Sequence, residues 1–194
     1  RAAVREACCE PGPEALEVFP VMPIGALRHA TVTRHHYHWT RATFGPPRLT
    51  DGVTVVGSSL VESGLLAEET YFQLVIEQLQ RLNATTGVYI SHRRERSSKI
   101  RRLISATKLR LGRSQVPLEI ELRRGPVGRS VVCFPSTPAF TLPLVLRGCD
   151  ATLNVVPLEP SQLNPQAEPR ARDFLTRIAA QLIAAGPAGG DQVE

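Results

Sequence analysis

The sequence places a histidine directly after a short apolar run, in Val88-Tyr-Ile-Ser-His92. Glu95 follows three residues later, after a basic pair that begins with Arg93. A histidine in this setting can donate a hydrogen bond or a proton to a phosphate oxygen, and a nearby carboxylate can tune its pKa. The alternative is an ordinary core or surface imidazole, and the position of His92 in the fold decides between them.

A second group of polar residues, Ser136 and Thr137, stands at a predicted helix start, between Pro135 and Pro138. The first N–H groups of a helix have no partner within it, and the helix dipole favours anions there. The two hydroxyls could therefore add donors to an anion site. The alternative is that Thr137 only caps the helix.

Two carboxylates also follow predicted strands. Glu119 would either take both hydroxyls of a ribose or remain a solvated acid on a short helix. Glu62 comes after the small-residue turn Gly57-Ser58-Ser59 and is either a general base or an acid at a helix start.

Alternating strands and helices must position these residues. Short β-branched or apolar runs predict strands at 53–57, 87–91, 109–111, 130–134 and 151–156. Capped or amphipathic runs predict helices at 68–82, 97–107, 118–124, 137–146 and 168–185. This order predicts an α/β fold, an open doubly wound parallel sheet of the Rossmann-like kind, over residues 51–186. Ligands of such sheets bind beyond the carboxyl ends of the strands, where the polar residues lie.

The remaining segments show no sustained periodicity. Residues 1–50 are expected to be irregular, and the Gly/Asp-rich residues 187–194 are expected to be a disordered tail. The first segment contains His35, His36 and His38, but no acid or cysteine lies at ligand spacing from them, so we predict no metal site.

Charge and cysteine usage narrow the partners and the compartment. The formal net charge is +5, and nine Lys/Arg lie between Arg93 and Arg113 against one acid, which favours an anionic partner. Only 5% of residues are aromatic and no nucleic-acid-binding motif appears, so we expect no nucleic acid. Four cysteines, two of them adjacent, predict no disulfide framework and favour the cytoplasm.

Four short motifs, taken in order, resemble the carboxyl-terminal half of bacterial sialyltransferases. They are Gly57-Ser-Ser-Leu-Val-Glu62, Tyr89-Ile-Ser-His-Arg-Arg-Glu95, Val116-Pro-Leu-Glu119 and Phe134-Pro-Ser-Thr-Pro-Ala-Phe140, and the resemblance covers residues 53–157. The similarity is to glycosyltransferase family 52 and the related bacterial polysialyltransferases. Their G-Q-P-L-x-E, H-P-R-E, P-x-E and S-T segments occur in the same order.

The resemblance implies the donor-binding, C-terminal half of a B-type glycosyltransferase with two Rossmann-like domains. CMP-sialic acid would be the donor substrate, with no obligatory cofactor or metal, and sialic acid would pass to a glycan acceptor with inversion. His92 would contact the CMP phosphate and assist its departure, while Ser136 and Thr137 would hold the same phosphate. Glu119 would bind the cytidine ribose. The other expected donor-binding residues are Gly57, Ser58, Arg93 and Glu95.

The sequence departs from the family pattern in places. Arg93 stands where the family has a proline, and Ser58 stands where it has a glutamine. The catalytic base is expected from the acceptor side, and Glu62 is a poor candidate for it. Residues 1–50 are too short for a complete acceptor domain, so we expect either a fragment or an acceptor half supplied from elsewhere. Such a donor domain alone would bind nucleotide but turn over little.

Two other functions remain open from the sequence. One keeps the fold and changes the nucleotide-sugar. The other is a non-enzymatic basic module that binds nucleic acid or an anionic membrane surface through residues 93–113. Peripheral association with the inner membrane and a homodimer also stay open, and the sequence does not indicate the acceptor or the linkage.

Overall fold

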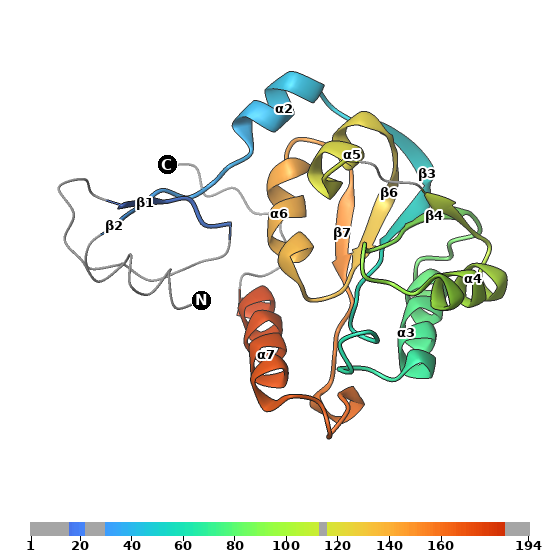
Figure 1. Ribbon diagram of the computed structural model, residues 1–194. Coiled ribbons are helices and arrows are strands. Elements are labelled where there is room, and N and C mark those ends of the chain that lie inside the picture. Colours follow the sequence, from blue (N-terminus) through green and yellow to red (C-terminus); the bar gives the residue numbers. More distant parts are fainter. Residues whose placement is uncertain (1–15, 22–29, 113–115, 185–194) are drawn as a thin grey trace.

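A five-stranded, wholly parallel sheet forms the centre of the protein. The computed structural model describes residues 16–21, 30–112 and 116–184 (Figure 1). The strands are β3 (Arg48–Val56), β4 (Gly87–Ile90), β5 (Leu109–Gly112), β6 (Pro126–Cys133) and β7 (Thr152–Val155). Their order is β5-β4-β3-β6-β7, and each neighbouring pair is parallel.

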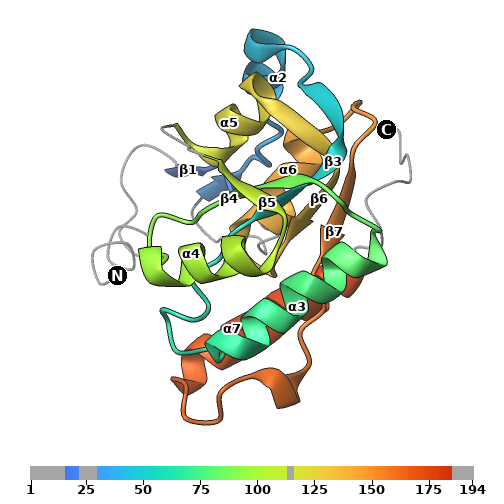
Figure 2. The same cartoon turned by 90° about the vertical axis from the view of Figure 1, so that its right-hand side faces the viewer.

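Helices cover both faces of this sheet. They are α3 (Glu68–Arg81), α4 (Ser97–Ala106), α5 (Leu118–Arg124), α6 (Thr137–Val145) and α7 (Pro169–Ala184), with a short 3-10 helix at Pro160–Gln162. Figures 1 and 2 show α3 and α4 on one side of the strands and α5 and α6 on the other. The prediction of an α/β fold with a parallel sheet between two helical layers is confirmed, and the arrangement is consistent with a Rossmann-like fold.

The alternation of side chains along each strand explains the two layers. Val53 and Val55 belong to the apolar cluster that includes Tyr71 of α3. Val56, on the opposite face, belongs to a second cluster that includes Leu142 of α6. A strand buried on both faces reads as a continuous β-branched run, which is why this strand was recognisable in the sequence.

The strand order creates a switch point next to β3. From β3 the chain runs outward through α3, β4 and α4 to β5, and then returns through α5 to β6 on the other side of β3. Connections therefore leave β3 and β6 toward opposite faces. In open parallel sheets the crevice beyond the carboxyl ends at such a point is the usual ligand site.

Strands β3 and β6 are longer than predicted. Arg48–Thr50 pairs with Pro126–Gly128, across a register irregularity between Thr50 and Val53. Asp51-Gly52 resembles a turn in sequence, but here it forms a bulge inside the strand pair. Gly128 is required at this point, because a Cβ there would overlap the Gly52 carbonyl oxygen.

The segment before the sheet differs from the irregular one expected for residues 1–50. Its described part contains β1 (Leu16–Val18) and β2 (Ala30–Val32), which pair in parallel, and helix α2 (His38–Phe44). Arg41 of α2 donates to the Leu144 carbonyl (2.6 Å) and Arg123 donates to the Val145 carbonyl (3.1 Å). These guanidinium groups complement the carboxyl end of α6 and hold α2 against the sheet domain.

Two further observations concern the tail of the chain and the membrane. The tail predicted at 187–194 lies outside the described residues. Within the described ranges, each helix is too short or too polar to cross a bilayer.

Candidate functional site

A cleft of about 740 Å³ opens beyond the carboxyl ends of β3, β4, β5 and β6. It therefore lies at the switch point of the sheet. Seven of the eight residues expected to bind the donor line it: Gly57, Ser58, His92, Arg93, Glu119, Ser136 and Thr137. The eighth, Glu95, lies in the buried network described below and is not among the lining residues.

The loop after β3 is held by its backbone. The Ser58 N–H donates to the Tyr71 hydroxyl (3.1 Å), and the Ser58 carbonyl accepts from the Lys99 ammonium (3.0 Å). Gly57 is needed because a Cβ there would overlap Glu95 Oε2 and come within 2.7 Å of the Tyr89 hydroxyl. The absence of a side chain at Gly57 thus lets Glu95 and Tyr89 pack directly against the backbone beneath the cleft.

His92 begins the loop after β4 and is partly buried. Its backbone N–H donates to Glu95 Oε2 (2.6 Å), and its Nδ1 accepts from the Arg94 N–H (3.2 Å). A backbone N–H can only donate, so Nδ1 carries no proton and Nε2 carries the ring N–H. Burial lowers the pKa of His92, and Arg93 and Arg94 lower it further against the opposing effect of Glu95. At neutral pH the ring is therefore an uncharged Nε2–H donor.

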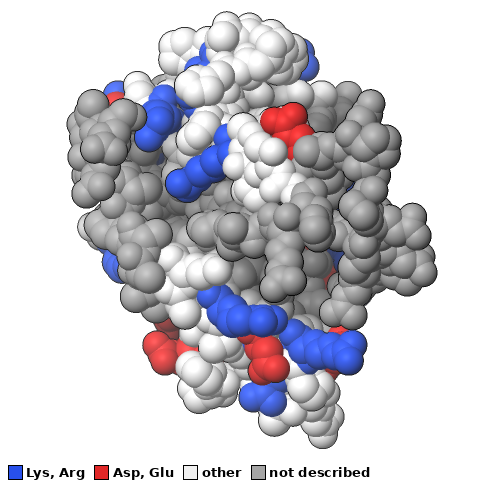
Figure 3. All heavy atoms as spheres, turned by 90° about the vertical axis from the view of Figure 1, so that its left-hand side faces the viewer, with Lys and Arg blue, Asp and Glu red and all other residues white. Residues whose placement is uncertain are grey.

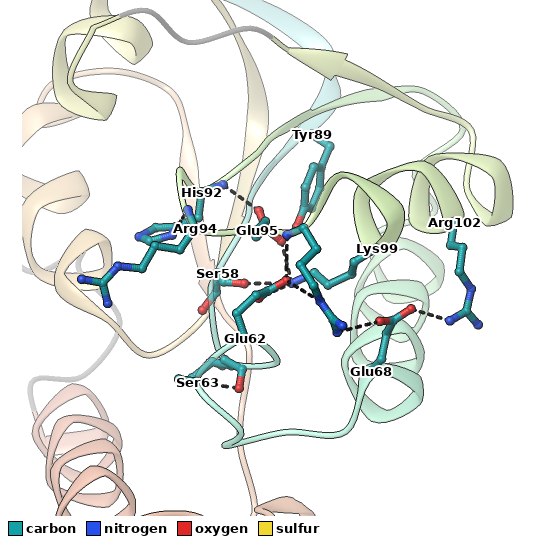
Figure 4. A network of polar contacts seen from close by, with 12 residues as sticks. Ser58, Glu62, Ser63, Glu68, Tyr89, His92, Arg94, Glu95, Lys99 and Arg102 are labelled. Atoms are coloured by element: carbon teal, nitrogen blue, oxygen red, sulfur yellow. Dashed lines mark hydrogen bonds and ion pairs between the residues drawn. The ribbon is translucent and has the colours of Figure 1, made fainter.

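A network of buried polar groups lies under both loops (Figure 4). The Lys99 and Glu95 side chains are 0% exposed, and Lys99 Nζ lies 2.7 Å from Glu95 Oε1. The Tyr89 hydroxyl donates to the same oxygen (2.5 Å) and lies 2.8 Å from the Tyr71 hydroxyl. Burial is the main cause that raises the pKa of both tyrosines, so both hydroxyls stay protonated.

Glu62 belongs to the edge of this network. Its Oε1 accepts from the Arg96 N–H (3.0 Å), and its Oε2 lies 3.3 Å from Lys99 Nζ. Burial raises the pKa of Glu62, but the hydrogen bond from Arg96 and the charge of Lys99 help to lower it overall. A carboxylate with a lowered pKa is a weak base, and both oxygens of Glu62 already have partners, so Glu62 is poorly suited to act as a general base.

The amino end of α6 forms another wall of the cleft. The helix begins at Thr137, its N-cap is Ser136, and no side-chain hydrogen bond caps it. The Ser136 hydroxyl instead donates to the Phe134 carbonyl (3.0 Å). The two hydroxyls are therefore not used for capping, and the first turn of α6 faces the cleft with its dipole.

The far wall, formed by the end of β5 and the start of α5, is more apolar. Leu111, 49% exposed, and Leu118 line it together with the partly buried Glu119. One oxygen of Glu119 accepts from the Thr141 hydroxyl (2.8 Å), which anchors the carboxylate between α5 and α6. The cleft thus has a polar end near His92 and an apolar end with one fixed carboxylate.

The basic run 93–113 is partly neutralised. Arg96 pairs with Glu62 and Glu68, Arg102 pairs with Glu68 and Glu69, and Lys99 is buried. Figure 3 shows another face of the molecule, where basic and acidic side chains lie interspersed near its lower end. The described part of the basic run therefore does not form a uniformly basic surface.

Lys99, Tyr71 and Tyr89 are residues of this site that the sequence did not predict. Glu95 and Lys99 have the i, i+4 spacing of a helical ion pair, but such pairs are usually exposed. Near the three clustered histidines, the described residues contain no group of three metal-binding side chains.

Comparisons with known proteins identify no relative of this chain. No family model matches the chain, and neither the curated proteins nor the solved structures give a significant match. The cleft itself, and the four motifs that line it, are therefore the features from which a function can be inferred.

Proposed function

We propose that the cleft binds a nucleotide-sugar and that the domain is the donor-binding half of a B-type glycosyltransferase. One observation carries the proposal: the Nε2–H donor of His92 and the amino end of α6 line the same cleft at the switch point of the sheet. Both are suited to a phosphate group. The four sialyltransferase-like motifs make CMP-sialic acid the first donor to test.

The size and polarity of the cleft support a ligand of this class. About 740 Å³ lies within the range of small-molecule sites. A phosphate at the polar end would meet His92, Ser136 and Thr137. The nucleoside would extend toward Leu111 and Leu118, and Glu119 would accept hydrogen bonds from the ribose hydroxyls.

The chemistry assigned to these residues is stabilisation of the leaving group. In an inverting transfer, the acceptor oxygen forms a bond to the anomeric carbon as the bond to the CMP phosphate breaks. Negative charge then grows on the phosphate. The His92 N–H, the amino end of α6 and the exposed Arg93 side chain would stabilise this charge. The acceptor proton passes to a base on the acceptor side, which we do not assign to Glu62.

The proposal also concerns the turnover, the cellular location and the partners of the domain. Without an acceptor half, the chain would bind nucleotide and turn over little. Cytoplasmic localisation, peripheral association with a membrane and pairing of two chains remain predictions. The ion pairs of Arg96 and Arg102 with acidic residues make the alternative, a basic nucleic-acid or membrane module, less favourable.

Calorimetric titration tests the proposal. CMP, UDP, GDP and a short oligonucleotide would be titrated into the wild type and into His92→Ala and Ser136→Ala. We expect CMP to bind best and His92→Ala to weaken it about tenfold or more, because a hydrogen bond to a charged group is lost. His38→Ala, an exposed histidine on α2, and Ser161→Ala, an exposed serine in the 3-10 helix, are the matched controls.

The outcomes separate the hypotheses. If none of the nucleotides binds, the proposed function is wrong. Equal or better binding of UDP or GDP keeps the fold and moves the donor to another nucleotide-sugar. Salt-sensitive oligonucleotide binding that survives both substitutions favours the basic module instead.

A further inference from the structure

The two loops that line the polar end of the cleft are fixed by one buried network. Glu95 Oε2 accepts from the His92 N–H, so the carboxylate holds the loop after β4. The Ser58 carbonyl accepts from Lys99, so the ammonium holds the loop after β3. Lys99 and Glu95 pair with each other at 2.7 Å, and this contact joins the two loops (Figure 4).

The hydrogen bonds in this network have a single direction. A carboxylate cannot donate, so the Tyr89 hydroxyl donates to Glu95. Its proton is then used, and the proton between the two tyrosines must come from Tyr71. The Tyr71 oxygen in turn accepts from the Ser58 N–H. Each donor in the chain of hydrogen bonds from Ser58 through Tyr71 and Tyr89 to Glu95 therefore has an acceptor. The N–H of Ser58 is engaged by Tyr71, and its carbonyl is engaged by Lys99.

We propose that Glu95, Lys99, Tyr71 and Tyr89 are positioning residues that set the distance between the two phosphate-facing loops. None of them needs to touch the ligand. The consequence for binding rests on the proposed function of the cleft, whereas the consequence for the loops does not. Apolar residues of equal volume would fill the same space but could not hold the Ser58 carbonyl or the His92 N–H.

Tyr71→Phe is the sharpest substitution for this proposal. It removes the hydroxyl that accepts from Ser58 but keeps the ring, which stacks on Phe134 with centroids 4.5 Å apart and lies 3.9 Å from Lys99 Nζ. Val75→Ala is the matched control, because Val75 is fully buried one turn further along α3 and takes no part in the network.

The first readout needs no ligand. Amide hydrogen exchange would be measured at Ser58 and His92 relative to the amides of β6. In Tyr71→Phe we expect the Ser58 amide to exchange about tenfold faster on this relative scale, because a buried donor has lost its acceptor. In Val75→Ala the ratio should stay at its wild-type value even if the whole domain is less stable.

Two further readouts complete the test. Where the wild type binds CMP, Tyr71→Phe should weaken binding about tenfold while Val75→Ala leaves it unchanged. Glu95→Gln is a second variant. Its one amide oxygen stays with Lys99 and Tyr89, so the His92 N–H faces an NH2 group and the turn that places Arg94 loses its anchor. The single Nε2–H tautomer of His92 should then become a mixture in ¹⁵N spectra.

The result that overturns the proposal is a wild-type exchange ratio in Tyr71→Phe together with a single His92 tautomer in Glu95→Gln. The network would then only fill the core. If the wild type does not bind CMP, the proposed function fails, and the exchange and tautomer measurements still decide the role of the network.

Discussion

Replacing Lys99 by methionine would leave the Glu95 carboxylate buried without its cation. The substitution keeps most of the side-chain volume but removes the contacts to Glu95 (2.7 Å), the Ser58 carbonyl (3.0 Å) and Glu62 (3.3 Å). Both paired side chains are 0% exposed, so water cannot compensate for the loss. Breaking such a pair costs about 3–5 kcal/mol of unfolding free energy.

A double-mutant cycle isolates the pair from the other contacts. Lys99→Met with Glu95→Gln removes both charges, and without Lys99 the amide oxygen can turn to accept from the His92 N–H. The main remaining defect is then the Ser58 carbonyl without a donor, which costs about 1–3 kcal/mol. The double variant should therefore be more stable than Lys99→Met alone, with a coupling of about 2 kcal/mol. Urea unfolding measures these values, because a domain of this kind is stable by about 5–15 kcal/mol.

The control for this cycle is Arg102→Met. Arg102 also pairs with two acids, but it is exposed, so its loss should shift the urea midpoint far less than the loss of Lys99. A loss of less than about 1 kcal/mol in Lys99→Met would contradict a buried ion pair, and so would a double variant that loses the sum of the two single losses.

Gly57, His92 and Arg123 each allow a further test. Gly57→Ala should cost about 1–3 kcal/mol in urea unfolding, because the new Cβ overlaps Glu95 Oε2; an unchanged midpoint contradicts the close approach. The pKa of His92 is lowered from 6.5 and that of Glu62 from 4.5, so the unfolded state binds more protons in each window. The unfolding free energy should therefore fall as the pH drops below 6.5 and again below 4.5. His92→Ala should reduce the first decrease but leave the part that comes from His36, whose pKa is also lowered. Arg123→Met should speed amide exchange in α2, since Arg123 bonds both the Val145 and the Arg41 carbonyls; protection equal to the wild type speaks against this docking.

The sheet and its helices could be predicted because each is specified locally. Val53–Val56 is a β-branched run, and the apolar positions of α3 and α4 recur at helical spacing, so neighbouring residues decide the structure. The extension of β3 back to Arg48 could not be predicted in this way. It depends on the pairing with β6, which overrides the turn-like Asp51-Gly52.

The residues that line the cleft could be predicted from the sequence. The buried network beneath them could not. The rule about strand ends collects His92, Ser136 and Glu119 at one site from the strand order alone. The burial of Lys99 depends instead on how the start of α4 meets the loop after β3. No local pattern contains this contact, and a lysine in a basic run reads as exposed. Cys133 and Cys149 both lie in apolar runs that are typical of core positions. The structure buries Cys133, where burial raises the pKa of the thiol to about 12, but leaves Cys149 half-buried.

The most direct test of the central claim is an NMR titration of the ¹⁵N-labelled protein with CMP. If CMP binds in the cleft, the His92 Nε2 signal and the amide signals of Ser58 and Thr137 should shift together and saturate at one dissociation constant. Shifts confined to the exposed basic residues of α4, or no saturable shift at His92, would contradict a nucleotide-phosphate site in this cleft.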